Sequence, residues 1–144
     1  SHKANVMGPD DLNVELVEDT SMSAPIASHH IHWYNTNIEE TRAWYVKTFG
    51  AVAGKRDQFE AADLPGINLS FSMAKATPEG TKGRALDHIG FEVKDLEAFT
   101  KKLEASGVKF DRPFTRVPAL GISLAFLTDP WGTYIELTEG LSNW

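Results

Sequence analysis

The chain of 144 residues contains one sequence pattern twice. Residues 29–35 and 87–93 each place a His before an apolar alternation of period two, which is typical of a strand with one buried face. An amphipathic helix is predicted after each strand, over residues 38–49 and 96–106. The repeat is roughly 60 residues long, which exceeds a solenoid period, so we expect the two copies to pair with each other.

Both predicted helices have recognisable ends. Asn37 is placed to cap the first helix, and Glu40 completes a pair that resembles a capping box. Gly50 and Gly107 stand where a positive φ is expected just past a helix end. The apolar stripes consist of Ile38, Tyr45 and Phe49, with Trp44 beside them, and of Leu96, Phe99 and Leu103.

About three further strands are predicted after each helix. In the first copy they lie at 52–59, 60–63 and 67–72, and in the second near 108–112, 122–127 and 134–138. Asp129, Pro130 and Gly132 predict a turn: the Asp129 side chain can accept hydrogen bonds from the backbone ahead of it, Pro130 fixes φ, and Gly132 tolerates a positive φ. In the alignment of the copies, residues 67–70 correspond to residues 135–138, so that Asn68 matches Glu136.

The first 27 residues lie outside the repeat. We expect disorder over residues 1–5, a strand over 12–17 and a linker over 19–27. Residues 9–18 share Pro, Glu, Leu and Glu with residues 130–139 at a constant offset. Two interpretations are open: the last strand of a missing preceding module, or an N-terminal strand that pairs with a sheet edge. In the first case, Glu15 should have no His partner in this chain and should bind no metal.

Composition narrows the classes of function. The net charge of −6 and the scattered basic residues argue against nucleic-acid binding. No stretch approaches the roughly 18 consecutive apolar residues of a membrane helix, and no signal-peptide pattern opens the chain. We therefore expect a soluble protein without membrane partners, cytoplasmic by default. Because the chain has no Cys, any metal is left to His and carboxylate ligands.

Residues two apart on a strand share a face, so the polar side chains of each predicted strand lie together on one face. Two neutral imidazoles and one carboxylate suit a divalent transition metal and leave positions free for substrate or water. A lone His is more often structural, and a Glu on a strand usually faces solvent, but His30 and His88 occupy the same place in both copies. The three predicted polar faces are His30, His32 and Tyr34; His88, Gly90 and Glu92; and Tyr134, Glu136 and Thr138.

With these motifs the chain resembles the vicinal oxygen chelate superfamily, which includes glyoxalase I, extradiol dioxygenases, and fosfomycin- and bleomycin-resistance proteins. The resemblance covers about residues 27–140 and rests on His-Ile at a strand start, Trp44-Tyr45 before Gly50, and the segment from Asp129 to Leu137. It implies an α+β fold of two paired βαβββ modules that form an open, cupped sheet around a metal site. The expected domain spans residues 28–144, with module one at about 28–75 and module two at about 86–140, after an N-terminal segment 1–27.

The resemblance also implies a ligand set for one divalent ion of iron, manganese, zinc or nickel. The ligand positions fall on His30, His88 and Glu136. The fourth position, often Glu in glyoxalase-like members, matches Asn68, and an amide oxygen is a poor ligand for zinc or nickel. A site of two His and one carboxylate is closer to the dioxygenase and fosfomycin-resistance pattern, whose open positions bind two neighbouring substrate oxygens.

Three functions remain open: a metal enzyme in which His32 or Tyr34 moves protons, a metal-free binding protein, and a degenerate module retained for assembly. We favour an enzyme of dioxygenase-like or glyoxalase-like chemistry that acts on a small molecule, because a binding role does not call for His30, His88 and Glu136 together. A homodimer is expected, since open sheet edges invite pairing. The predicted substrate-binding residues are Asn68, Phe126, Trp131 and Tyr134, and Tyr34 joins the aromatic three in a metal-free cavity.

Overall fold

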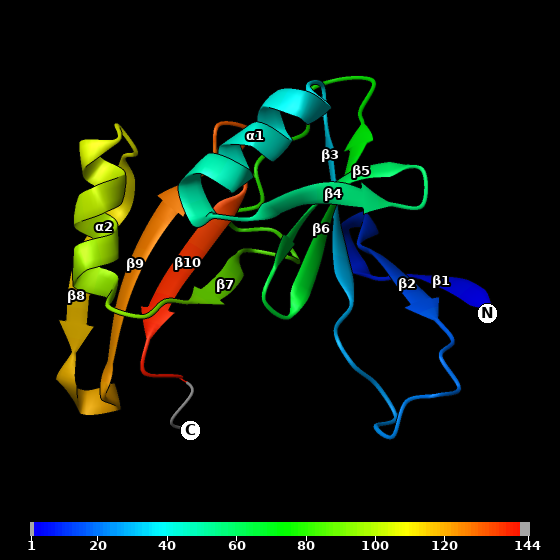
Figure 1. Ribbon diagram of the computed structural model, residues 1–144, viewed down its shortest axis with the longest axis horizontal. Helices are drawn as coiled ribbons and strands as arrows, with labels where there is room; N and C mark the ends of the chain where they lie inside the picture. The colour runs from blue at the N-terminus through cyan, green and yellow to red at the C-terminus, as the bar shows by residue number, and fades with distance from the viewer. Residues whose placement is uncertain (1, 142–144) are drawn as a thin grey trace. The chain divides into compact units, whose positions relative to one another are not determined.

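A computed structural model describes residues 2–141 and divides into two compact units, with the boundary between Pro78 and Glu79. Each unit contains one four-stranded sheet and one α-helix (Figure 1). Ser1, for which disorder is expected, and the last three residues of the predicted 28–144 domain lie outside the described residues. Within residues 2–141, no helix has the length and apolar composition needed to span a membrane.

The first unit contains a βαβββ module. Its elements are β3 (His30–Asn35), α1 (Ile38–Phe49), β4 (Val52–Arg56), β5 (Phe59–Leu64) and β6 (Ile67–Met73). The strand order is β3-β6-β5-β4, in which β3 and β6 are parallel and the other neighbours are antiparallel. Helix α1 packs on β4, β5 and β6.

The second unit repeats this topology. Its elements are β7 (Ile89–Glu92), α2 (Leu96–Ala105), β8 (Phe110–Val117), a short 3-10 helix (Pro118–Leu120), β9 (Ile122–Thr128) and β10 (Tyr134–Glu139). The order β7-β10-β9-β8 again pairs the first and last strands in parallel, and α2 packs on β8, β9 and β10. The predicted α+β fold of two βαβββ modules is therefore confirmed.

Strand parity determines which side chains reach the core. On β3, Trp33 and Asn35 are buried, whereas Tyr34 is 59% exposed. The rings of Trp33, Tyr45 and Phe71 lie within 6.2 Å of one another, so β3, α1 and β6 meet in one aromatic core. In the second unit, the buried apolar side chains are Leu96, Leu103, Leu124, Ala125, Leu127, Ile135 and Leu137.

The helix ends form as the sequence predicts. The Asn37 side chain accepts a hydrogen bond from the Glu40 backbone N–H at 3.1 Å and donates one to the Glu40 carboxylate at 2.9 Å. Gly50 has a φ of 72° at the end of α1. Asp95 accepts a hydrogen bond from the Ala98 N–H at 3.1 Å at the start of α2. Local capping residues therefore fix both ends of α1 and the start of α2.

The N-terminal segment forms a hairpin of β1 (Lys3–Met7) and β2 (Asn13–Val17), joined by a short 3-10 helix (Pro9–Asp11). The strand predicted over residues 12–17 is confirmed. The expected disorder is wrong for Lys3–Asn5, because these residues pair with β2. The hairpin is a separate two-stranded sheet, so the predicted pairing with the edge of a module sheet is not the one formed.

The hydrogen-bond register corrects the alignment of the two copies. In module two, Glu136 pairs with Gly90, two residues after His88. The corresponding residue of module one is His32, and it pairs with Ser70, not with Asn68. Ser70 therefore occupies in β6 the place that Glu136 occupies in β10. Module one has no carboxylate of its own at this position.

The turn between β9 and β10 brings two glycines together. Asp129 Oδ1 accepts hydrogen bonds from the N–H groups of Trp131 and Thr133, at 2.9 and 2.7 Å. Gly132 has a φ of 94°, and a Cβ at this position would lie 2.8 Å from the Cα of Gly80. Glycine is needed here both for its backbone conformation and for the close approach of the loop before β7.

We expect Gly132→Ala to destabilise the second unit more than Gly107→Ala. Gly107 has a nearly equal φ of 92° but open space around its Cβ position, so it isolates the cost of the backbone conformation. That cost is roughly 1–2 kcal/mol, and the clash at Gly132 should add about 1–3 kcal/mol. Chemical denaturation of both variants measures the difference. Equal losses would show that the contact between the glycines is not important.

Candidate functional site

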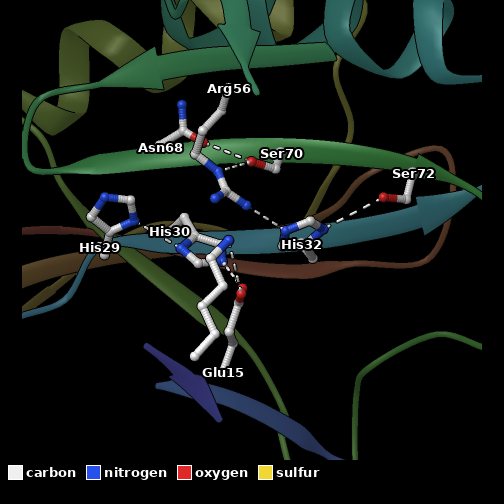
Figure 2. Close-up of polar contacts among 9 residues, drawn as sticks. Glu15, His29, His30, His32, Arg56, Asn68, Ser70 and Ser72 are labelled. Carbon is white, nitrogen blue, oxygen red and sulfur yellow. Dashed lines mark hydrogen bonds and ion pairs between the residues drawn. The ribbon is translucent and has the colours of Figure 1, made fainter. Parts of the chain in front are cut away.

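The first unit brings together one carboxylate and two imidazoles. His30 and His32 stand on the same face of β3, with their ring centres 5.0 Å apart. Glu15 reaches them from β2 of the hairpin (Figure 2). One possible ligand atom from each of these residues lies within 4.8 Å of the others, and all three residues are half-buried. We call this set the Glu15–His30–His32 cluster.

His30 is the most enclosed member of the cluster, with a side chain 6% exposed. Its Nε2 lies 2.9 Å from Glu15 Oε2, and its Nδ1 lies 2.8 Å from His29 Nδ1. Because a carboxylate only accepts hydrogen bonds, Nε2 carries the proton and the neutral ring accepts from His29 at Nδ1. Lys3 Nζ lies 3.6 Å from the other oxygen of Glu15. The expectation that Glu15 has no His partner in this chain is therefore wrong.

His32 is held by a cation. Arg56 Nη2 lies 2.5 Å from His32 Nε2, and because a guanidinium only donates, His32 accepts at that nitrogen. Its proton is then on Nδ1, which lies 3.4 Å from Ser72 Oγ. Arg56 Nε also donates to Ser70 Oγ at 2.8 Å, and Ser70 donates to Asn68 Oδ1 at 2.7 Å. The residue that replaces Glu136 in module one therefore anchors Arg56.

Burial and charge set the protonation of the cluster. Burial lowers the pKa of His30 and of His32, and the charge of Arg56 lowers both pKa values further, although Glu15 acts in the opposite direction. Burial raises the pKa of the Glu15 carboxyl, but the hydrogen bond from His30 and the charge of Lys3 outweigh it, so the pKa lies below its usual value. Near neutral pH the cluster thus contains a carboxylate and two neutral imidazoles.

This donor set fits a divalent transition metal. Two His nitrogens and one carboxylate oxygen form a common set of protein ligands that leaves coordination positions open. The low pKa values of His30 and His32 keep both rings neutral, as ligation requires. Arg56 opposes this fit, because it uses a ring nitrogen of His32.

The second unit forms a different polar face. His88 Nε2 lies 3.2 Å from Glu136 Oε2, and His88 Nδ1 lies 2.8 Å from Asp87 Oδ1. The rings of Phe126 and Tyr134 stack at 5.1 Å, and both meet the His88 ring edge to face. Among the predicted site residues, the structure therefore brings His88, Glu136, Phe126 and Tyr134 together. Lys82 Nζ lies 4.3 Å from the centre of the Tyr134 ring.

The other predicted site residues are distributed as follows. Tyr34 lies on the same face as His32, with ring centres 6.3 Å apart. Asn68 donates to Asp63 at 2.6 Å, and Trp131 lies in the turn before β10. His30 belongs to the first unit, whereas His88 and Glu136 belong to the second, so the ligand set of these three residues stays a prediction. The roles of Tyr34, Asn68 and Trp131 also stay predictions.

Sequence reasoning did not select Glu15 or Arg56. A signal for Glu15 was present, since the match of residues 9–18 to 130–139 aligns Glu15 with Glu136. Both residues indeed contact a His, His30 in one unit and His88 in the other. Arg56 has no such signal, because an Arg at the end of a weak strand is ordinary in a sequence with scattered basic residues.

Comparison with known proteins gives a family and a fold. The family model described as Glyoxalase/Bleomycin resistance protein/Dioxygenase superfamily matches residues 27–137. Comparison with curated proteins gives no match.

Three solved structures show the similarity of the fold. The protein SMU.1112c is 25% identical with a TM-score of 0.66, and the match covers 81% of this chain and 100% of that one. A glyoxalase/bleomycin resistance protein/dioxygenase superfamily member from Sphaerobacter thermophilus is 21% identical with a TM-score of 0.63, covering 80% and 98%. The lactoylglutathione lyase from Agrobacterium tumefaciens is 18% identical with a TM-score of 0.61, covering 81% and 95%.

The cluster should make the metal-free protein sensitive to mild acid. His30 and His32 have lowered pKa values in the folded state, so below the usual His pKa of about 6.5 the unfolded chain binds more protons. Their contribution to stability is present above that pH and is lost as the pH falls. Urea denaturation with a chelator, at about pH 7.5 and about pH 5.5, should show a smaller loss for His30→Asn/His32→Asn than for the wild type. The same loss in both proteins would contradict this assignment.

Proposed function

The chain belongs to the Glyoxalase/Bleomycin resistance protein/Dioxygenase superfamily, and from this premise we propose that it is a metal-dependent enzyme. Its substrate is a small molecule that chelates the ion through neighbouring oxygens. The observation that supports the proposal best is the Glu15–His30–His32 cluster, in which a buried imidazole contacts an ionised carboxylate beside a second imidazole. A structural role alone does not call for three side chains that could ligate a metal, brought together from β2 and β3.

Glu15, His30 and His32 are the residues that would hold the ion. Glu15 and His30 would hold it in place of the proton that they now share. The carboxylate offsets the charge of a divalent cation. The family resemblance gives a second ligand set, His30, His88 and Glu136, which contains the same His. A bound divalent ion supplies polarisation of a substrate oxygen or activation of dioxygen.

The remaining polar groups on this face supply proton transfer. Tyr34 is exposed and lies beside His32, so its hydroxyl is accessible to a ligand at the cluster. When His32 is not a ligand, its ring acts as the proton-transfer group predicted from the sequence. Substitution distinguishes these roles, because loss of a ligand removes the metal, whereas loss of a proton-transfer group lowers turnover and leaves the metal bound.

A second function is favoured by a separate observation. The stacked rings of Phe126 and Tyr134, with His88 at their edge and Lys82 on the Tyr134 ring, form a half-buried aromatic surface. Such a surface suits a flat ligand without any metal. The alternative proposal is therefore a metal-free binding protein of the bleomycin-resistance type. In that case Tyr134→Ala abolishes ligand binding and metal loading has no effect.

The expected homodimer remains a proposal. The hairpin supports it by presenting an exposed apolar face, which consists of Ala4, Val6, Val14 and Leu16. Light scattering of the purified protein tests the proposal, and a monomeric mass would contradict it.

Glu15→Gln and Glu136→Gln test the metal proposal and choose between the ligand sets. Each variant keeps the size of the side chain and removes the charge that offsets the cation. If the cluster is the site, Glu15→Gln should weaken Co²⁺ binding by more than the roughly 10–100-fold expected for a residue outside the coordination sphere. Glu136→Gln should then bind as the wild type does. Isothermal titration calorimetry measures both affinities.

Glu18→Gln is the matched control, since it removes the same charge close to the hairpin, where Glu18 contacts His2. It should leave Co²⁺ affinity nearly unchanged. Loss of affinity in Glu136→Gln alone would support the ligand set implied by the family. No Co²⁺ binding by the wild type, or wild-type affinity in both variants, would contradict a metal-dependent enzyme and favour the aromatic binding protein.

A further inference from the structure

Arg56 is a half-buried cation whose hydrogen-bond partners are neutral. It donates to Ser70 Oγ and to His32 Nε2, and its guanidinium lies 5.7 Å from the centre of the Phe59 ring. Three other arginines, Arg42, Arg84 and Arg116, each form an ion pair with a Glu. Among residues 2–141, no carboxylate oxygen lies within ion-pair distance of Arg56.

Burying part of the Arg56 charge without a counter-ion costs free energy, and a ligand that supplies the counter-ion would offset this cost. Removing a charge from water without a counter-ion is unfavourable, and hydrogen bonds to neutral groups offset only part of the cost. Glu15 is near enough for Arg56 to lower its pKa, but the Glu15 oxygens contact His30 and Lys3. Arg56 is therefore a cation without a carboxylate partner at the edge of the candidate metal site (Figure 2).

Arg56 and a divalent ion exclude each other at Nε2 of His32. The lone pair of His32 Nε2 accepts the Arg56 hydrogen bond, so the same lone pair cannot also bind a metal. A guanidinium in contact with a ligand ring would also repel a cation bound to that ring, and the repulsion is strong in a half-buried site. Metal binding through His32 Nε2 therefore requires Arg56 to leave this nitrogen.

The planar fork of a guanidinium matches the two oxygens of a carboxylate, and such bidentate contacts are among the strongest hydrogen bonds in proteins. The hydrogen bond from Nε to Ser70 and the contact with Phe59 keep Arg56 beside the cluster when its contact with His32 breaks. A carboxylate on the ligand would supply the counter-ion that Arg56 lacks.

We infer that Arg56 selects ligands that bear a carboxylate group, and that its transfer from His32 to this group couples ligand binding to metal binding. The inference rests on the proposed metal-dependent function, and it adds the substrate class and the order of events at the same site. Without the anion, Arg56 takes the place of the cation at His32. With the anion, His32 is free to complete the ligand set.

The first experiment measures anion binding to the metal-free protein. Benzoate is titrated into protein in a chelator, because it carries one carboxylate and chelates metals weakly. The wild type should bind benzoate, and Arg56→Met should bind it at least about tenfold more weakly, as expected for a lost charge-assisted hydrogen bond. Arg56→Lys, which keeps the charge but not the planar fork, should be intermediate and guards against a folding defect in Arg56→Met.

Lys55→Met is the matched control. Lys55 precedes Arg56 on β4, has a side chain 69% exposed and pairs with Glu60, so its substitution removes the same charge from the same strand. Its benzoate affinity should stay within about twofold of the wild type. Wild-type benzoate affinity in Arg56→Met, or equal losses in Arg56→Met and Lys55→Met, would overturn the role of Arg56. Tighter binding of inorganic phosphate than of benzoate would overturn the carboxylate preference.

The second experiment measures Co²⁺ affinity with and without saturating benzoate. In the wild type, benzoate should strengthen Co²⁺ binding by about tenfold, and Co²⁺ should strengthen benzoate binding by the same factor, since coupling is reciprocal. Arg56→Met should bind Co²⁺ more tightly than the wild type in the absence of benzoate and gain nothing from it. Direct ligation of benzoate to the ion would give the same gain in both proteins and would overturn the coupling.

The two experiments separate the inference from the proposed function. If the wild type binds no Co²⁺ in any condition, the metal-dependent function fails and the coupling fails with it. The loss of benzoate binding in Arg56→Met would still support Arg56 as the anion-binding residue. If Co²⁺ binds through Glu15 but benzoate affinity is unchanged in Arg56→Met, the proposed function stands and the inference fails.

Discussion

The first unit depends on one constraint: successive side chains of β3 point alternately into the core and to the opposite face of the sheet. Trp33 and Asn35 point into the core, where Trp33 meets Tyr45 and Phe71, and this packing fixes the strand on α1 and β6. His30 and His32 are consequently forced to the other face, whatever they do there. The energy that holds the imidazoles in place comes from apolar burial on the opposite side of the same strand. Residues on the polar face can therefore serve a chemical function without being needed for the packing of the strand.

The two modules share a topology but obtain their carboxylates differently. In the second unit, Glu136 stands on β10 and meets His88 from within the module sheet. In the first unit, the equivalent position is Ser70, and the carboxylate beside His30 comes from Glu15 on a separate hairpin. Ser70 has a different contact, because its Oγ accepts a hydrogen bond from Arg56 Nε. The same register position therefore holds a carboxylate that contacts His88 in module two, and a hydroxyl that binds Arg56 in module one.

Much of the fold was predictable because its signals are local. Asn37 and Gly50 define a helix without reference to distant residues, and the alternation of β3 places His30 and Trp33 on opposite faces. The strand alignment failed for a physical reason: a shift of two residues preserves the parity of an alternating strand, so the sequence cannot distinguish Asn68 from Ser70 as the match of Glu136. Only the hydrogen-bond register decides. The contacts of Glu15 and Arg56 depend on tertiary structure and were not accessible to periodicity.

The hairpin of β1 and β2 has a consequence for how this site can change over time. It forms a sheet of its own, shares no strand pairing with either module, and is followed by residues 18–29, which contain no helix or strand. A carboxylate that stands on such an appendage is independent of the core that orients the imidazoles. The chain can lose or exchange this group by altering a short peripheral segment, without redesigning the domain. Evolution can therefore change the carboxylate ligand on the hairpin and the packing of the module core independently of each other.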